Sequence, residues 1–256
     1  MINSSSGAAM PARSSISTLP PAIASSEIKG VTLGHVENAR VASGATAIVF
    51  DKPAIASISV LGGAPGGRDT GLLEPDMTVE AVDALVLSGG SAFGLDAAGG
   101  AQAALAAMGR GFPVGNLRIP IVPQAIVFDL LNGGDKDWGA KPPYWDWGKA
   151  AVEHAAKTFA LGSVGAGYGA TTATLKGGFG TATATTQRGH KVQAFMVVNA
   201  IGTATLGETG QFWAAPYERG IEFGGLGLPA AMPNGALALR IKGHAAEPAT
   251  TIGIVV

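Results

Sequence analysis

Three kinds of polar side chain stand at the ends of expected strands or inside an uncharged stretch, where functional groups are often found. Asn199 ends the apolar run MVVN, where its side-chain amide could donate a hydrogen bond to an oxyanion. Lys176 lies in the nearly uncharged stretch ATTATLKGG, where a partly buried lysine with a lowered pKa could act as a base or charge anchor. Thr250 and Thr251 open the apolar run TTIGIVV. Each also has a structural interpretation, because asparagine and lysine are common in exposed turns and threonine pairs are common in strands.

Two glycine-rich loops are further candidates. The segment SGGSAFG, residues 88–94, joins an expected strand to an expected helix, where backbone N–H groups can bind an anion or oxyanion. It lacks the Lys-Ser/Thr pair of a P-loop, and Phe93 stands where a G-x-S-x-G motif centred on Ser91 would have glycine. A tight turn that needs glycine for close packing is the alternative. In GGAPGGRD, residues 62–69, Arg68 either contacts a substrate or pairs with Asp69 at the surface.

The composition excludes several other kinds of chemistry. The 256 residues contain no Cys, which rules out disulfides, thiol nucleophiles and Cys-zinc sites. The four His residues have no metal-ligand spacing, and we interpret them as surface or structural residues: His35, His154, His190 and His244. A formal net charge of −1 does not favour nucleic acid or anionic lipid as a partner, and no apolar run is long enough for a membrane span. Charged residues are 14%, against roughly 25% in ordinary soluble domains, which predicts a large buried fraction.

The elements that position these groups can be predicted from runs and periodicity. Short apolar runs predict strands that alternate with glycine turns, at residues 31–36, 46–50, 57–61, 82–87, 119–131, 181–186, 192–198 and 250–256. Helical spacing predicts helices at 95–108 and 142–160. Residues 203–233 have many glycines and few regular patterns, which predicts a loop region. We expect residues 240–249 to form an exposed linker. The strands and helices do not alternate regularly, so we expect helices packed on a mixed sheet rather than a doubly wound parallel fold.

Taken together, the segments resemble one family over nearly all of residues 30–256. The likeness rests on seven motifs in order: GVTLGH, GATAIVF, LSGGSAFGLDAAGG, IPIVPQAIVFDL, GSVGAGYGATT with LKGGFG, VVNAIG and PATTIGIVV. This pattern is similar to the L-aminopeptidase/D-esterase (DmpA-type) family of self-processing peptidases, whose relatives include β-peptidyl aminopeptidases and the endo-type nylon-oligomer hydrolase. The resemblance implies a four-layer αββα sandwich, with the C-terminal part of the β subunit lacking in this chain.

The resemblance also implies a mechanism. Such a chain cuts itself before a Thr or Ser, which then becomes an N-terminal nucleophile. Thr250 falls on that nucleophile, and Ala249–Thr250 is the expected cleavage site. A threonine hydroxyl is a poor nucleophile at neutral pH, but its freed α-amine supplies a nearby base. Asn199 falls on an oxyanion donor and Lys176 on a lysine beside the nucleophile, so neither cofactor nor metal is expected.

The expected substrate pocket includes Phe128, Ser91 and Phe93. Phe128 stands where the nylon-hydrolase branch has a tyrosine, so it can shape the pocket without donating a hydrogen bond. The aminopeptidase branch carries a glutamate in this strand for the free amine of the substrate. The residues just before Phe128 are apolar here, which predicts a broader amidase.

We therefore expect a flexible tail at residues 1–28, the α-subunit portion at 29–249, and the start of the β-subunit strand at 250–256. The expected partners are a small peptide or amide substrate, the protein's own β-subunit segment and further copies in a homo-oligomer, with no nucleic acid and no membrane. The N-terminal residues lack a signal-peptide pattern, so a cytoplasmic location is expected. Two alternatives remain: an acyltransferase of the ornithine acetyltransferase type, and a non-catalytic oligomeric scaffold.

Overall fold

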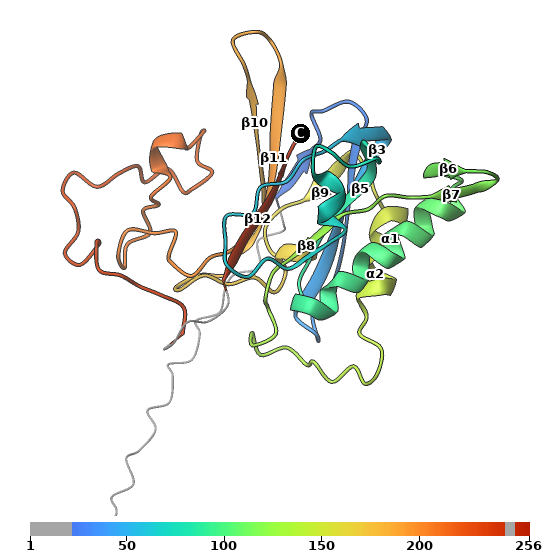
Figure 1. The fold of residues 1–256 in the computed structure, drawn as a ribbon. Helices are drawn as coiled ribbons and strands as arrows, with labels where there is room; N and C mark the ends of the chain where they lie inside the picture. The colour runs from blue at the N-terminus through green and yellow to red at the C-terminus, as the bar shows by residue number, and fades with distance from the viewer. Residues whose placement is uncertain (1–21, 244–248) are drawn as a thin grey trace, which may run out of the picture.

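A layer of helices and two β-sheets stack on one another in the computed structural model, which describes residues 22–243 and 249–256 (Figure 1). The order is helices, a five-stranded sheet and a three-stranded sheet. Among the described residues α1 and α2 are the only α-helices, so these residues do not form the helical layer expected outside the three-stranded sheet. Within the same residues, no helix has the length and apolar content that crossing a membrane requires.

The five-stranded sheet is mixed. Its strand order is β2-β3-β5-β8-β4, formed by β2 (Val31–Asn38), β3 (Ser43–Ile55), β5 (Ala81–Ser88), β8 (Gln124–Ile126) and β4 (Gly67–Arg68). The pair β5–β8 is parallel and the other pairs are antiparallel, which confirms the expectation of a mixed sheet. Helices α1 (Asp96–Ala107) and α2 (Tyr144–Glu153) pack on its outer face.

Glycine lets the two helices approach closely. A Cβ at Gly100 of α1 would lie 1.8 Å from the Trp145 carbonyl oxygen, and one at Gly148 of α2 would lie 1.9 Å from that of Ala97. Both distances are far inside van der Waals contact, so any larger residue would push the helices apart. The alanine-rich face of α1 fills the remaining space against the sheet.

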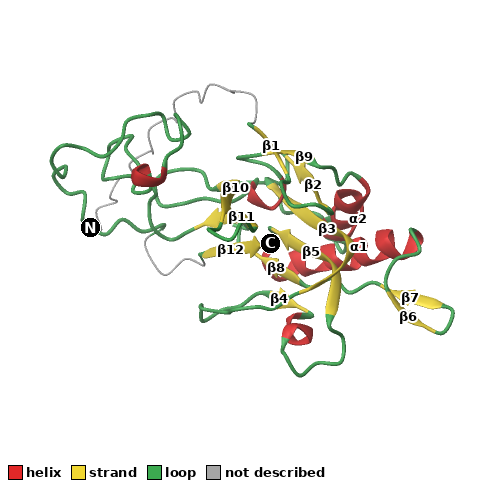
Figure 2. Ribbon diagram, turned by 90° about the horizontal axis from the view of Figure 1, so that it is seen from above, coloured by secondary structure: helices red, strands yellow, loops and turns green. Residues whose placement is uncertain are grey.

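The three-stranded sheet is antiparallel, with β11 between β10 and β12. Its strands are β10 (Gly178–Thr185), β11 (Lys191–Asn199) and β12 (Thr250–Val255). Its inner face packs against the five-stranded sheet, and the two sheets are seen from above in Figure 2. The core between them includes Leu33, Ile48, Leu87, Phe195, Val197 and Ile254. Residues 200–243 extend from the end of β11 on the side away from α1 and α2, and are mostly loop with one short 3-10 helix, η4 (Ala215–Tyr217).

Several expected boundaries were wrong. Residues 57–61 form no strand, and they lie largely exposed beyond the end of β3. The expected helix at 142–160 ends at Glu153, and Thr158–Ala160 is instead β9, paired with β1 (Ile23–Ser25) inside the expected N-terminal tail. Residues 1–21 of that tail lie outside the described residues. The prolines at 120 and 123 divide the expected 119–131 strand, leaving β8 and a separate hairpin of β6 (Phe112–Val114) and β7 (Leu117–Ile119).

His35 is a structural histidine of the core, as expected. It packs edge-on against the rings of Phe159 and Phe179, and its Nδ1 lies 2.9 Å from the Thr46 Oγ1. Burial lowers the pKa of His35 from 6.5 to about 4. The neutral ring is therefore the form that the folded core accommodates.

We expect acid to destabilise the protein through His35. The unfolded chain takes up a proton near pH 6.5 and the folded chain only near pH 4, so this contribution is complete above pH 6.5 and is lost as the pH falls toward 4. Between pH 7 and pH 4 the loss in the free energy of unfolding amounts to about 3 kcal/mol. Urea unfolding at pH 7 and pH 4 measures it, with His35→Asn as the non-titrating comparison. Wild type should lose about 3 kcal/mol more than the variant, and equal losses in both proteins would show that His35 does not carry the effect.

Candidate active site

Thr250 is the first residue of β12 and lies directly opposite Asn199, the last residue of β11. Buried residues alternate with half-buried ones along β11, and Asn199 belongs to the buried, inward-facing set with Phe195 and Val197. Opposed residues of an antiparallel pair project to the same face, with Cβ atoms about 4.5–5.5 Å apart. The structure therefore brings the Thr250 side chain beside the Asn199 amide, at the edge of the inter-sheet core.

The Asn199 amide is fully buried and held by hydrogen bonds at both ends. Its Oδ1 accepts from the Thr171 backbone N–H at 3.0 Å, and its Nδ2 donates to the Phe128 carbonyl at 2.8 Å. These two backbone groups fix which end of the amide is the donor. An amide nitrogen carries two hydrogens, and the bond to Phe128 uses one of them. The arrangement is that of a preorganised donor.

The backbone after β8 connects Asn199 to the glycine turn of residues 88–94. Phe128, half-buried, gives its carbonyl to Asn199, while the preceding carbonyl of Val127 accepts from the Ser91 N–H at 3.1 Å. Ser91 has φ +52° and follows Gly90 at φ +82°, so two successive residues occupy the left-handed region. A non-glycine residue there is uncommon and marks a turn held by its surroundings. Of the expected pocket residues, Phe128 thus bonds Asn199 through its backbone carbonyl, and Ser91 bonds the preceding residue, Val127.

The other two expected side chains, those of Phe93 and Lys176, each contact an aromatic ring. Phe93 is half-exposed and its ring packs edge-on against Trp138, 5.5 Å between centroids. Lys176 is exposed, and its Nζ lies 5.1 Å from the centre of the Tyr168 ring. Lys176 also pairs with Thr171 in an isolated β-bridge, and the Thr171 N–H donates to the Asn199 Oδ1.

Asp129 is a buried carboxylate that the sequence analysis did not single out. It accepts hydrogen bonds from the Ser43 hydroxyl at 2.6 Å and from the Gly90 N–H at 2.7 Å, and Tyr144 donates in turn to Ser43 at 2.9 Å. Burial raises the pKa of Asp129, while the bonds from Ser43 and Gly90 act in the opposite direction. This network holds the turn before Ser91. A charged residue at the end of the apolar run AIVFD was the available signal.

Lys242 is the second residue that was missed. We expected residues 240–249 to be an exposed linker, yet Lys242 is half-buried and its Nζ donates to the Asn199 Oδ1 at 3.0 Å.

Arg68 makes the contacts of a structural residue. Its guanidinium donates to the Leu95 carbonyl and to Gln102 and pairs with Asp69 at 3.7 Å.

The two residues of the expected cleavage site, Ala249 and Thr250, are both half-buried. Among the residues that the structure describes, no three His, Cys, Asp or Glu side chains gather in a group that could hold a metal ion. His154 and His190 are exposed, and His244 lies outside the described residues.

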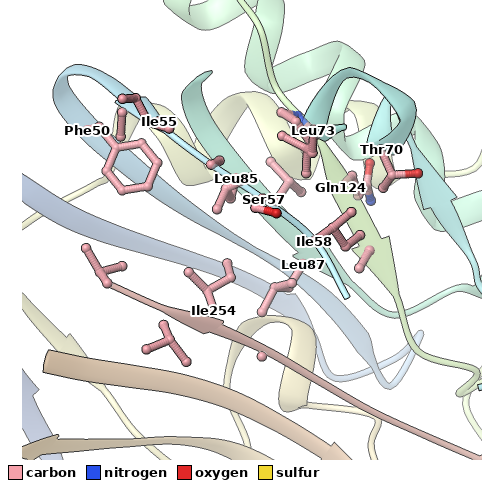
Figure 3. Close-up of a pocket in the computed structure, with 18 residues that line it drawn as sticks. Phe50, Ile55, Ser57, Ile58, Thr70, Leu73, Leu85, Leu87, Gln124 and Ile254 are labelled. Atoms are coloured by element: carbon pink, nitrogen blue, oxygen red, sulfur yellow. The ribbon is translucent and has the colours of Figure 1, made fainter. Parts of the chain in front are cut away.

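A cavity of about 550 Å³ opens at the other end of β12 (Figure 3). It is lined mostly by apolar side chains, among them Phe50 and Leu85 of the five-stranded sheet, Ile254 of β12 and Ile58 of the segment after β3. Neither Thr250 nor Asn199 lines it. The polar groups at the start of β12, rather than this apolar cavity, therefore form the candidate active site.

Comparisons with known proteins show the family to which this chain belongs. The sequence model of peptidase family S58 matches residues 24–256. An uncharacterised aminopeptidase of Mycobacterium tuberculosis is 40% identical over 197 residues, which cover 74% of this chain and 56% of that protein. A similar protein of Mycobacterium leprae is 37% identical over 203 residues, covering 73% and 55%. This chain therefore spans about half the length of these relatives.

Among solved structures, a β-aminopeptidase of Burkholderia sp. superposes with a TM-score of 0.52 at 21% sequence identity, covering 70% of this chain and 52% of that one. This likeness confirms the expected fold type. The family match favours a peptidase over the acyltransferase alternative.

Proposed function

Because this chain belongs to peptidase family S58, we propose that the full-length protein is an amide hydrolase that cuts itself before Thr250 and then uses Thr250 as its nucleophile. The observation that carries the proposal is the register of β11 and β12, in which Thr250 opens its strand directly opposite Asn199. A nucleophile and an oxyanion donor need this mutual placement.

In the proposed reaction, the freed α-amine of Thr250 accepts the proton of the Thr250 hydroxyl as the oxygen attacks the substrate carbonyl. An α-amine has a pKa of about 7.7–8.0, near neutral pH. The second Nδ2 hydrogen of Asn199 donates to the oxyanion, with the amide kept in place by Thr171 and Phe128. The α-ammonium returns its proton to the leaving amine, and water then releases the acyl group from Thr250. Lys176 would orient or tune the nucleophile.

The pocket residues support small peptides or simple amides as substrates. Phe128 is a half-buried apolar residue whose carbonyl holds the Asn199 amide, and Ser91 lies in the adjoining turn. The residues just before Phe128, at positions 125–127, are apolar and offer no carboxylate for a free substrate amine. We therefore propose a broad amidase specificity.

We also propose that the protein's own β-subunit segment, which follows the nucleophile, packs beside β12. β12 is an edge strand of its sheet, and edge strands present unpaired backbone groups. The neighbouring cavity and the side chain of Val255, which is 68% exposed, offer apolar surface for such a segment to cover.

The β6–β7 hairpin supports the proposed homo-oligomer. Phe112, Val114, Leu117 and Ile119 share one face of this two-stranded ribbon, and each is about half-exposed. Such a one-sided apolar ribbon is typical of a surface that another chain covers. We expect Leu117→Arg to weaken assembly by roughly 30-fold or more, the effect of losing a central interface contact.

Light scattering after size-exclusion chromatography of the full-length protein measures this effect. Arg118→Ala is the matched control, because Arg118 lies on the opposite face of the same ribbon. The expected result is a smaller species for Leu117→Arg alone. An unchanged mass for both variants would place the interface elsewhere.

Hydrolysis assays on the full-length protein test the proposed function. A panel of aminoacyl anilides and N-acylated anilides, with an acetyl donor and an amino-acid acceptor in parallel, should give anilide release without acetyl transfer. Acetyl transfer as the main reaction would identify an acyltransferase instead. An uncut protein with neither activity would identify a non-catalytic scaffold.

A further inference from the structure

Lys242 is anchored at the candidate active site by both its backbone and its side chain. Its N–H donates to the Ile201 carbonyl at 2.8 Å, and its Nζ donates to the Asn199 Oδ1 at 3.0 Å. Ile201 and Asn199 mark the end of β11. The start of the linker is therefore bound to the same strand end that Thr250 faces.

Eight residues further along the chain, Thr250 pairs with Asn199, so Lys242 and Thr250 both lie at the end of β11. Fixing one end of a short segment beside the other reduces the conformational space that must be searched to bring the ends together. The Lys242 anchor thus favours conformations in which the Ala249 carbonyl lies near Asn199.

The charge of Lys242 suits the chemistry of the cut. In self-cleavage the Thr250 hydroxyl attacks the Ala249 carbonyl carbon, and negative charge develops on that carbonyl oxygen. The peptide C–N bond then breaks, the hydroxyl proton passes to the departing α-amine, and an ester joins Ala249 to the Thr250 oxygen. Water hydrolyses the ester to the Ala249 carboxylate and the free hydroxyl. An ammonium bonded to the Asn199 oxygen stabilises that developing charge and keeps the amide oriented.

We propose that Lys242 is a positioning residue for self-cleavage, acting through Asn199 in the uncut chain. This inference rests on the proposed function, since it assigns a role within the cleavage step. The two lysines of the region differ in their contacts: Lys242 bonds Asn199 directly, whereas Lys176 lies over the Tyr168 ring.

Cleavage kinetics of the full-length protein test the proposal. Freshly translated wild type, Lys242→Met and Lys242→Arg are followed by gel and intact mass as the single chain converts to two fragments. We expect Lys242→Met to slow cleavage about 10- to 100-fold, the effect of losing one charge-assisted hydrogen bond. Lys242→Arg keeps the positive charge and the donor and should stay within about 3-fold of wild type.

Arg240→Met is the matched control, because it removes a positive charge from the same linker at a surface ion pair with Glu208. It should cleave at the wild-type rate. Thermal unfolding of each uncut variant checks that the fold is retained. Lys242→Met at the wild-type rate, or Lys242→Arg as slow as Lys242→Met, overturns the inference while the proposed function stands. An uncut wild type would overturn both.

Discussion

Replacing Thr250 by alanine leaves the full-length protein as a single chain and lowers amide hydrolysis by about 10⁴-fold or more, the usual effect of removing a nucleophile. The variant lacks the hydroxyl that attacks the Ala249 carbonyl, so neither the cut nor the α-amine base forms. Thr250→Ser keeps a hydroxyl and should still cut itself and hydrolyse substrate. Gel analysis and anilide hydrolysis measure the two effects together.

Thr251 provides the matched control for this prediction. It is the next residue of β12, pairs with Val198 and is exposed, so its side chain projects from the opposite face. Thr251→Ala should therefore cut and hydrolyse like wild type. If Thr251→Ala rather than Thr250→Ala were the inactive protein, the register of β12 would have to shift by one residue.

Asn199→Ala should lower kcat by about 10²- to 10³-fold, the range for loss of one oxyanion donor. The same substitution leaves the Thr171 N–H and the Phe128 carbonyl without their partner, at a cost of about 1–3 kcal/mol for each unsatisfied group. The prediction is therefore a joint loss of stability and of kcat, measured by urea unfolding and by steady-state hydrolysis on the cleaved fraction.

Gln193 separates the catalytic loss from the structural one. It is a second fully buried amide on the same face of β11, and it accepts from the Glu27 N–H and donates to Ser25 and Thr181. Gln193→Ala should lose comparable stability with little change in kcat. If both variants lost kcat equally, the role of Asn199 would be structural only.

The sheets were largely predictable from the sequence. The runs at residues 31–36, 46–50 and 82–87 are rich in β-branched and apolar residues and form β2, β3 and β5. Over these residues β3 and β5 are largely buried on both faces, so they need no polar alternation. The small-residue helix after Gly94 formed for an equally local reason. Thr250 and Asn199 were named from motif order, and the structure places them in register.

What the sequence did not reveal depends on contacts between distant segments. Residues 57–61 have strand-like composition but no partner strand among the described residues, and composition alone cannot supply one. The pairing of β1 with β9 joins segments more than a hundred residues apart. The bond from Lys242 to Asn199 depends on how a glycine-rich loop returns to the sheet, which carries no periodic signal. Asp129 is recognisable only when the turn around Gly90 is in place.

The mass of the small fragment of the full-length protein tests the central claim most directly. Intact-mass measurement combined with N-terminal sequencing should find two fragments, the larger ending at Ala249 and the smaller beginning with an unmodified Thr250. A protein that hydrolyses amides as one uncut chain, or a small fragment that begins at any other residue, would contradict the account.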